Sequence, residues 1–435
     1  MATTLRLAPL FTNHMVLQQD QTTRFFGYAE PNQEVTVTIS MGGSEDTVET
    51  GIADETGYFL IESISFLAPT IVTILVTSGT DKIILRDVQF GDVFLVAGQS
   101  NANFKMAQDD EYEHNKSMPM MNLRFINIPE TQSTEDNPWQ IVDGENIGDV
   151  TAMGYYMAKK IRQYDEYTPV GIVLCAKNGT SAASWVSEKT LMNDATLKAA
   201  YVDTKIPSLE ESENLYDTML SQVGPYRFKM LAWYQGERDA GIDTKHYGLL
   251  LKKLIREWRK TLKQNKLPTY IVQLPQYNKN IVNSWAEIRE AQQQFAATEN
   301  RVYLVTTMDE PSADEIHPSS KRQLGYRIIE LYSNFGKFDE MQTSPQLSEI
   351  SADVKQMRLN FSNCEQLETV YPIDLKWIMP GDVLKPAVID LGTNDIKIQL
   401  EEDSLGLQYA YANVTTAGLW NENHTPVSPF RIYFD

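Results

Sequence analysis

The chain has 435 residues, of which 42% are hydrophobic and 22% are charged, so it is long enough for two or three domains and has the composition of a folded globular protein. Its 58 Asp and Glu outnumber its 38 Lys and Arg, and the formal net charge of −20 repels nucleic acid and anionic membranes at long range. We therefore expect neither a nucleic-acid partner nor a membrane partner.

The sequence carries no sign of a bound cofactor. Its five histidines lack HxxxH and HxH spacing, and Cys175 and Cys364 lie too far apart for a CxxC pair, so we expect no metal and no organic cofactor. No stretch reaches the roughly 20 apolar residues of a membrane-spanning helix, and the first residues lack the apolar core of a signal peptide. These features predict a cytoplasmic protein, with a secreted or periplasmic location as the alternative if a leader has been removed. The sequence indicates no oligomeric state.

Both ends of the chain have the alternating pattern of β-strands. In residues 1–88, Val35, Val37 and Ile39 alternate with threonines, and a second apolar run covers residues 71–76. In residues 339–435 the alternation returns at 354–361, 396–400 and 407–411. We predict an N-terminal β domain over 1–88 and a C-terminal β-rich domain over 339–435.

Residues 89–338 have a different pattern, in which short apolar runs alternate with segments of helical periodicity. The runs cover 93–97, 170–175, 228–233, 270–274 and 302–305. Helical spacing marks 150–161 and 250–262, Ser284 is a candidate cap of a third helix, and Pro318 is expected to start a fourth. Unalternating apolar runs are typical of strands buried on both faces, so we predict an α/β domain with a parallel sheet covered by helices.

The segment Gly98-Gln-Ser100-Asn101 follows the first buried strand of this region. Ligands of open α/β sheets bind at the carboxyl ends of the strands, so Ser100 is well placed for a nucleophile. Gly98 allows a sharp turn of the backbone, and a helix starting there would hold negative charge at its amino end. The plainer interpretation is a strand-to-helix turn in which Ser100 or Asn101 caps the helix.

Asp314 and His317 follow the last buried strand, three positions apart. A serine nucleophile needs a base to remove its proton, and the base needs a carboxylate to fix its tautomer. One loop therefore supplies both groups, with His317 held by the helix expected to begin at Pro318. A surface loop with an incidental histidine has the same pattern.

Two further loops after buried strands contain candidate donors for an oxyanion. Gln235 provides a side-chain amide, and Gly179 has a backbone amide that a substrate oxygen can approach closely. Glu237 and Asp239 follow Gln235 and leave a glycoside hydrolase open as a rival, or simply an acidic loop. The Gly179 loop could equally be an ordinary turn.

Together these motifs resemble the SGNH hydrolase superfamily, and within it the sialate O-acetylesterase-like carbohydrate esterases. The resemblance spans most of the chain, because residues 10–18 and Gly27-Tyr-Ala are similar to that family's N-terminal β domain. Residues 409–413 and Pro429-Phe-Arg431 are similar to its C-terminal signature. It implies a flavodoxin-like three-layer α/β/α core with a parallel sheet, flanked by β-rich segments.

The resemblance also implies roles for individual residues. Ser100 would be the nucleophile, and Asp314 and His317 would complete the triad. The oxyanion hole would comprise the amides of Ser100 and Gly179 with the side chain of Gln235. Gln99, Asn101 and Glu237 are expected to contact substrate.

The activity implied is removal of O-acetyl groups from a carbohydrate through an acetyl-enzyme, most readily from O-acetylated sialic acid. An acetyl xylan esterase is one alternative, and a non-catalytic carbohydrate-binding protein with an esterase-like fold is another. Net charge does not choose between these sugars, because screening over about 8 Å leaves the choice to local cations. Arg124, Lys177 and Arg238 lie near the motifs and are candidates for that role, or plain surface residues.

Overall fold

The computed structural model describes residues 5–118, 120, 122–130, 137–204, 214–279, 284–310, 312–337, 340–415 and 417–434. The chain forms two compact units. Unit 1 comprises Met1–Trp233, Lys253–Thr269 and Ser320–Gly325, and unit 2 comprises Tyr234–Lys252, Tyr270–Ser319 and Tyr326–Asp435. The predicted domain boundaries after residues 88 and 338 stay predictions.

The N-terminal part of unit 1 consists of strands, as the alternating pattern predicts. One sheet contains β1 (Arg6–Leu7), β3 (Thr23–Tyr28) and β6 (Tyr58–Ser63), all antiparallel. A second group contains β2 (Val16–Gln18), β4 (Glu34–Ser40), β5 (Thr47–Ile52) and β7 (Thr70–Ser78). Val35, Val37 and Ile39 are buried in β4, which confirms the period-two interpretation of this segment.

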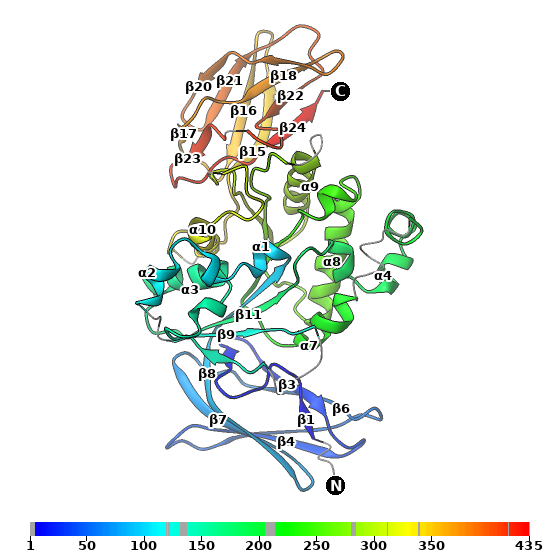
Figure 1. Cartoon of the computed structure of the whole chain (residues 1–435), viewed down its shortest axis with the longest axis vertical. Coiled ribbons are helices and arrows are strands. Elements are labelled where there is room, and N and C mark those ends of the chain that lie inside the picture. Colours follow the sequence, from blue (N-terminus) through cyan, green and yellow to red (C-terminus); the bar gives the residue numbers. More distant parts are fainter. Residues whose placement is uncertain are drawn as a thin grey trace. The chain divides into compact units, whose positions relative to one another are not determined.

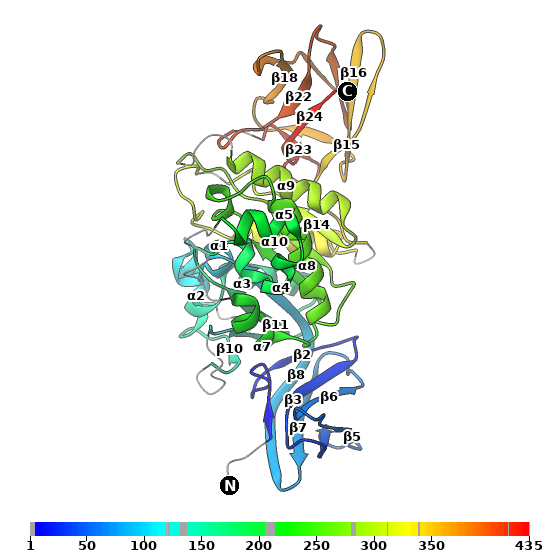
Figure 2. The same ribbon diagram turned by 90° about the vertical axis from the view of Figure 1, so that its right-hand side faces the viewer.

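Strand β8 (Asp81–Gly98) has 18 residues and belongs to two groups of strands (Figures 1 and 2). Its first half pairs antiparallel with β7, and its second half pairs parallel with β11 (Val170–Ala176). Within unit 1 the sheet continues in the order β10-β9-β11-β8-β12. The other strands of this order are β10 (Gln140–Ile141), β9 (Leu123–Asn127) and β12 (Met230–Tyr234).

Helices alternate with these strands. They are α1 (Ser100–Asn103), α2 (Tyr112–Lys116), α3 (Ala152–Tyr164), α4 (Glu188–Met192), α5 (Ala195–Leu197), α7 (Ser221–Val223), α8 (Tyr247–Thr261), α9 (Ser284–Thr298) and α10 (Arg322–Tyr332). Helix α3 packs closely on β11, because a Cβ added at Gly154 would lie 2.7 Å from Cγ2 of Ile172. In the described part of the chain, no helix has the length and apolarity needed to cross a bilayer.

The helix predictions hold for α3, α8 and α9, but the predicted start at Pro318 is wrong. Helix α10 begins at Arg322, four residues later. The first turn of a helix tolerates proline, but a proline does not make a helix start there. The loop that contains His317 therefore continues past Pro318.

Unit 2 contains β13 (Thr269–Val272) and β14 (Val302–Val305), which are neighbours in the sheet, followed by a set of antiparallel strands. These are β15 (Gln346–Ala352), β16 (Gln356–Ser362), β17 (Leu367–Thr369), β18 (Leu375–Met379), β19 (Val383–Pro386), β20 (Ile389–Leu391), β21 (Asp395–Gln399), β22 (Gly406–Tyr409), β23 (Leu419–Asn421) and β24 (Phe430–Tyr433). Buried Leu359, Trp377, Ile396 and Tyr409 are part of their shared hydrophobic core. The architecture confirms the predicted class, an α/β core with β-rich segments.

Candidate active site

The Ser100 turn lies where β8 ends. Gly98 has φ of +134°, a value that L side chains rarely adopt, and the backbone N–H of Asn103 donates to the Gln99 carbonyl at 2.9 Å to close the turn. Ser100 is half-buried, whereas Gln99 and Asn101 are 3% and 0% exposed. Ser100 is therefore the most accessible of these three side chains, and those of Gln99 and Asn101 are buried.

Helix α1 starts at Ser100, but it has only 4 residues. A macrodipole grows with the number of aligned peptide units, so a single turn contributes little beyond its own free amides. Any stabilisation of an anion beside Ser100 therefore comes from individual N–H groups, not from a long helix.

The Gly179 loop lies beside this turn because β11 runs parallel to β8. Ala176 is opposite Gly98 in the register, and the backbone N–H of Lys177 donates to the Gly98 carbonyl at 3.2 Å. The Asn103 side chain then donates to Oδ1 of Asn178 at 2.9 Å. Asn178 thus ties this loop to α1.

Gly179 itself is exposed and has φ of +72°. A Cβ built there would meet no atom within 4 Å, so open space surrounds this position. Its neighbours are fixed, because Thr180 Oγ1 donates to the Lys177 carbonyl at 2.9 Å and accepts from Trp185 Nε1 at 3.0 Å. The loop therefore presents a rigid, accessible backbone at the carboxyl edge of the sheet.

Gln235 lies in unit 2 and is fully buried. Its Nε2 donates to Oδ2 of Asp239 at 2.5 Å, and its Oε1 accepts from the Tyr247 hydroxyl at 3.1 Å. The Gln292 amide also donates to the Gln235 carbonyl, at 2.9 Å. These contacts fix the orientation of the amide.

The same contacts weaken the glycosidase alternative. Asp239 is 0% exposed and accepts from Gln235, and Glu237 is 6% exposed. A glycosidase needs two carboxyl groups that reach the scissile bond from opposite sides. Asp239 instead orients a neighbouring side chain.

The loop after β14 carries Asp314 and His317. Asp314 is exposed and accepts a hydrogen bond from Nδ2 of Asn278, while the Asn278 backbone N–H donates to the Ala313 carbonyl at 2.8 Å. His317 is half-buried. The loop is thus held to the segment after β13 by contacts that include those of Asn278 and a hydrogen bond from Nε2 of Gln276 to the Glu310 carbonyl at 3.3 Å.

Asp309, at the start of this loop, has a structural partner. Its two carboxylate oxygens accept from NH1 and NH2 of Arg327 at 2.8 and 2.6 Å. Burial alone would lower the pKa of Arg327, but the charge and hydrogen bond of Asp309, together with the charges of Glu310 and Glu330, outweigh it and the pKa is raised. Asp314 is therefore the better candidate for a carboxylate that serves His317.

Comparison with known proteins identifies the family. The family of carbohydrate esterases described as sialic acid-specific acetylesterases matches residues 90–334, more than half of the chain. The chain belongs to this family. It is 23% identical over 365 residues to the human sialate O-acetylesterase, covering 74% of this chain and 69% of that protein. The mouse sialate O-acetylesterase is 24% identical over 391 residues, covering 74% and 72% of the two chains.

A solved structure shows the same fold over nearly the whole chain. The carbohydrate acetylesterase from Xanthomonas citri matches with a TM-score of 0.84 and 23% identity, covering 98% of this chain and 99% of that one. The resemblance read from the motifs is thus confirmed, and the chain is a carbohydrate O-deacetylating esterase. Family membership favours this enzyme over a non-catalytic carbohydrate-binding protein.

Two of the cations suggested from the sequence of the esterase have structural partners. Arg124 is 3% exposed and pairs with Asp87 at 3.0 Å, and Lys177 pairs with Glu130 at 2.6 Å. Arg238 is exposed. The pairs of Arg124 and Lys177 favour the plainer interpretation of these residues.

Lys105 is a residue of the esterase that the sequence did not point to. Its half-buried Nζ donates to Oδ1 of Asn127 at 3.2 Å, and in the described residues it has no carboxylate within ion-pair distance. Burial lowers its pKa to about 8, although the charge of Asp149 opposes the shift. Lys105 is thus a cation held without a counter-charge in direct contact.

The position of Lys105 follows from the strand register. Asn127 ends β9 opposite Leu174 of β11, which lies opposite Val96 of β8. Neighbouring strands are about 4.8 Å apart, so the end of β9 lies roughly 10 Å across the sheet edge from the end of β8. The ammonium group therefore lies along the same edge as the Ser100 turn and the Gly179 loop.

Proposed function

We propose that this esterase removes O-acetyl groups from O-acetylated sialic acid by a serine mechanism. His317 takes the proton of the Ser100 hydroxyl as its oxygen attacks the acetyl carbonyl carbon, and Asp314 holds the imidazole and stabilises its cation. The backbone amides of Ser100 and Gly179 and the side-chain amide of Gln235 hold the oxyanion.

The tetrahedral intermediate then collapses to an acetyl-enzyme, which water hydrolyses in a second step. The C–O bond to the sugar breaks, and His317 gives its proton to the departing sugar oxygen, which leaves an acetyl ester on Ser100. His317 next removes a proton from water, the resulting hydroxide attacks the acetyl carbon, and the Ser100 oxygen leaves and regains a proton. Acetate and the free sugar hydroxyl are the products.

The parallel register of β8 and β11 carries this proposal. It brings Gly98 opposite Ala176, and it is reinforced by the hydrogen bond between Asn103 and Asn178. Acyl transfer requires a nucleophile and a hydrogen-bond donor for the negative charge that develops on the carbonyl oxygen. At this edge, the accessible Ser100 can act as the nucleophile, and the exposed backbone of Gly179 can act as the donor.

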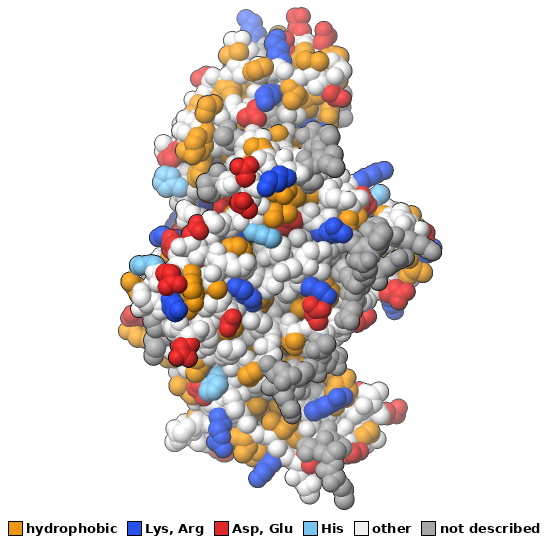
Figure 3. Space-filling view, viewed as in Figure 1, with side chains coloured by type: hydrophobic (Ala, Val, Ile, Leu, Met, Phe, Trp, Pro, Cys, Tyr) orange, Lys and Arg blue, Asp and Glu red, His pale blue; other side chains and the backbone are white. Residues whose placement is uncertain are grey.

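Lys105 supports an acidic sugar as substrate. Acidic and basic side chains are interspersed over the face seen in Figure 3, so no broad basic surface gathers anions there. A single half-buried ammonium group has a stronger effect at short range, because low dielectric strengthens its attraction to a carboxylate. Sialic acid carries that carboxylate, whereas an acetylated xylose residue carries none.

The substrate is tested by acetate release from O-acetylated sialic acid and from acetylated xylo-oligosaccharides, with wild type and Lys105→Gln. Because a charged hydrogen bond contributes about 1.5–3 kcal/mol, we expect KM for the sialate to rise about 10- to 100-fold. We expect kcat to stay within about twofold, because the lost contact binds substrate and transition state alike. The matched control is Lys82→Gln, since Lys82 is an exposed lysine of β8.

The pH profile gives a second measurement of the same contact. Lys105 is charged below its pKa of about 8 and loses its proton above it. In wild type, kcat/KM for the sialate should therefore fall as pH rises through about 8, beyond any fall seen with p-nitrophenyl acetate. In Lys105→Gln that additional fall should vanish. If the xylo-oligosaccharides are the better substrates and Lys105→Gln changes neither KM, the acetyl xylan esterase alternative replaces this proposal.

A further inference from the structure

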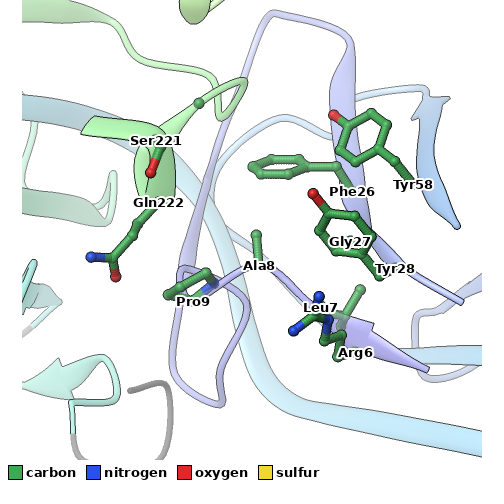
Figure 4. A pocket seen from close by; sticks show the side chains of 11 residues that line it. Arg6, Leu7, Ala8, Pro9, Phe26, Gly27, Tyr28, Tyr58, Ser221 and Gln222 are labelled. Carbon is green, nitrogen blue, oxygen red and sulfur yellow. The ribbon is translucent and has the colours of Figure 1, made fainter. Parts of the chain in front are cut away.

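Apart from the candidate active site, unit 1 contains a pocket between N-terminal strands and α7, with a volume of about 330 Å³ (Figure 4). Its lining residues come from β1, β3, β6, α7 and the segments next to β1 and α7. They are Arg6, Leu7, Ala8, Pro9, Phe26, Gly27, Tyr28, Tyr58, Ser221, Gln222 and Gly224. None of them belongs to the Ser100 turn or the Gly179 loop, so nothing in the esterase mechanism uses this pocket.

Strand register builds a row of three side chains along one wall. Arg6 of β1 is opposite Tyr28 of β3, and Tyr28 is opposite Tyr58 of β6. The Arg6 guanidinium carbon lies 4.6 Å from the centre of the Tyr28 ring, and the two tyrosine rings are 5.7 Å apart at 69°. A guanidinium group over an aromatic face is held in orientation by the ring quadrupole, so Arg6 is positioned before any ligand arrives.

Arg6 has no acidic partner in the residues that the structure describes, and the lining contains no Asp or Glu. This is unusual in a chain in which 58 acidic residues outnumber 38 basic ones. A guanidinium group offers two parallel N–H donors that match a carboxylate. The pocket therefore has the chemistry to hold one carboxylate.

The opposite side of the pocket is polar. Figure 4 shows Ser221 of α7 across the pocket from Phe26, Tyr28 and Tyr58, and the side chain of Gln222 pointing away from these rings. Ser221 is exposed, and Gln222 is fixed by a hydrogen bond from its Nε2 to the Pro129 carbonyl at 2.8 Å. A pyranose ring matches such a pocket, because its C–H groups pack on aromatic rings and its hydroxyls bond to polar groups.

We infer that this pocket binds a carboxylate-bearing pyranose, with the carboxylate on Arg6 and the sugar ring against Tyr28 and Tyr58. This would be a second glycan site, separate from the proposed esterase site. The inference goes beyond the proposed function because it is argued from the residues of this pocket alone. Sialic acid and glucuronic acid both carry that chemistry. Such a site would hold an acidic residue of the glycan, or the deacetylated product, without taking part in ester cleavage.

The test is calorimetric titration of the intact chain with two probes that carry no ester, the methyl glycosides of N-acetylneuraminic acid and of glucuronic acid. It is carried out with Lys105→Gln, so that binding through Lys105 does not contribute. Adding Arg6→Gln should weaken binding of at least one probe about tenfold or more, and Arg6→Lys should weaken it less. Adding Tyr28→Ala should also weaken it, whereas Arg86→Gln, an exposed arginine of β8, should not.

The two probes show which acidic sugar the pocket binds, sialic acid or glucuronic acid. Binding of either probe supports the site if that binding depends on Arg6. The inference is overturned if Arg6→Gln binds both probes as tightly as the parent, or if neutral methyl galactoside binds equally well. Turnover of p-nitrophenyl acetate and the thermal transition should be unchanged in the Arg6 variants. Arg6-dependent binding without sialate esterase activity would overturn the proposed function alone. Sialate esterase activity without Arg6-dependent binding would overturn only this inference.

Discussion

The two regions proposed to carry out the reaction are built in different ways. The Ser100 turn and the Gly179 loop are fixed by the parallel register of β8 and β11, with Ala176 opposite Gly98. The loop of Asp314 and His317 is held mainly by side-chain and loop contacts, including those of Asn278. A sheet register tolerates no gradual displacement, whereas a loop does. The proposed nucleophile is thus positioned by the fold, and the proposed acid–base pair by local contacts.

Replacing Ser100 tests the strand-anchored region and should have the largest effect. Ser100→Ala removes the nucleophile, and we expect kcat for acetate release to fall by about 10⁵-fold or more. The side chain is half-buried and small, so the thermal transition should stay within about 2 °C of wild type.

The matched control is Ser117→Ala, an exposed serine of the same unit, which should keep full activity. A fluorophosphonate should label wild type at Ser100 and leave Ser100→Ala unlabelled, as read by peptide mass spectrometry. Turnover that survives in Ser100→Ala would remove this residue from the mechanism.

The acid–base loop should show a graded response. We expect His317→Ala to lose about as much activity as Ser100→Ala, because members of a triad act as a unit. Asp314→Ala should lose about one to two orders of magnitude less, since it orients the base and does not transfer the proton. Steady-state kinetics on p-nitrophenyl acetate measure both.

Glu315→Gln is the control for Asp314, because Glu315 is its exposed neighbour in the same loop. If Asp314→Ala and Glu315→Gln prove equally mild, another carboxylate must serve the histidine.

Gln235 provides the next effect in size. Gln235→Leu removes one oxyanion donor, and we expect kcat to fall about 10²- to 10³-fold. It also leaves buried Asp239 without this donor, so the free energy of unfolding should drop by about 1–3 kcal/mol. Tyr247→Phe removes the bonds of the Tyr247 hydroxyl to the two Gln235 oxygens but keeps the Gln235 amide, and it should affect activity far less. Denaturant melts separate stability from rate, and equal rate losses in the two variants would mean that Gln235 acts only through packing.

The smallest effects compare the two tethers directly. Asn278→Ala breaks the bond to Asp314, and a hydrogen bond contributes about 1 kcal/mol, so we expect kcat to fall about fivefold. Asn103→Ala breaks the bond to Asn178, but the strand register and Thr180 still hold that loop, so the loss should be below about twofold. If Asn103→Ala lowers kcat more than Asn278→Ala, the strand register does not fix the Gly179 loop more firmly than local contacts fix the loop of Asp314 and His317.

Much of the fold could be predicted because the relevant residues act locally. The apolar runs at 93–97 and 170–175 mark strands by their own composition, and the spacing in 150–161 marks α3. Strand β9 was missed because Arg124 interrupts its apolar residues. That arginine is buried against Asp87, more than thirty positions away, and no local pattern shows this pairing.

The residues of the candidate site also differ in whether local sequence or distant contacts determine their positions. Ser100, Gly179 and Gln235 could be proposed from the sequence because each follows a recognisable strand, and the structure places each of them after a strand. Lys105 was missed because its position depends on β9 and Asn127. The loop around His317 was expected to be fixed by Pro318, but a proline next to a polar stretch does not determine where a helix begins.

Strand β8 has a consequence for any attempt to recombine this protein. Its residues 81–90 pair with the N-terminal strands, and its residues 92–98 lead without interruption to Gly98. Adding or deleting one residue in the first half would reverse which face each later side chain occupies. A chimera that exchanges the N-terminal segment must therefore keep the residue count of β8, because the spacing of a distant β-hairpin determines where the attacking hydroxyl points.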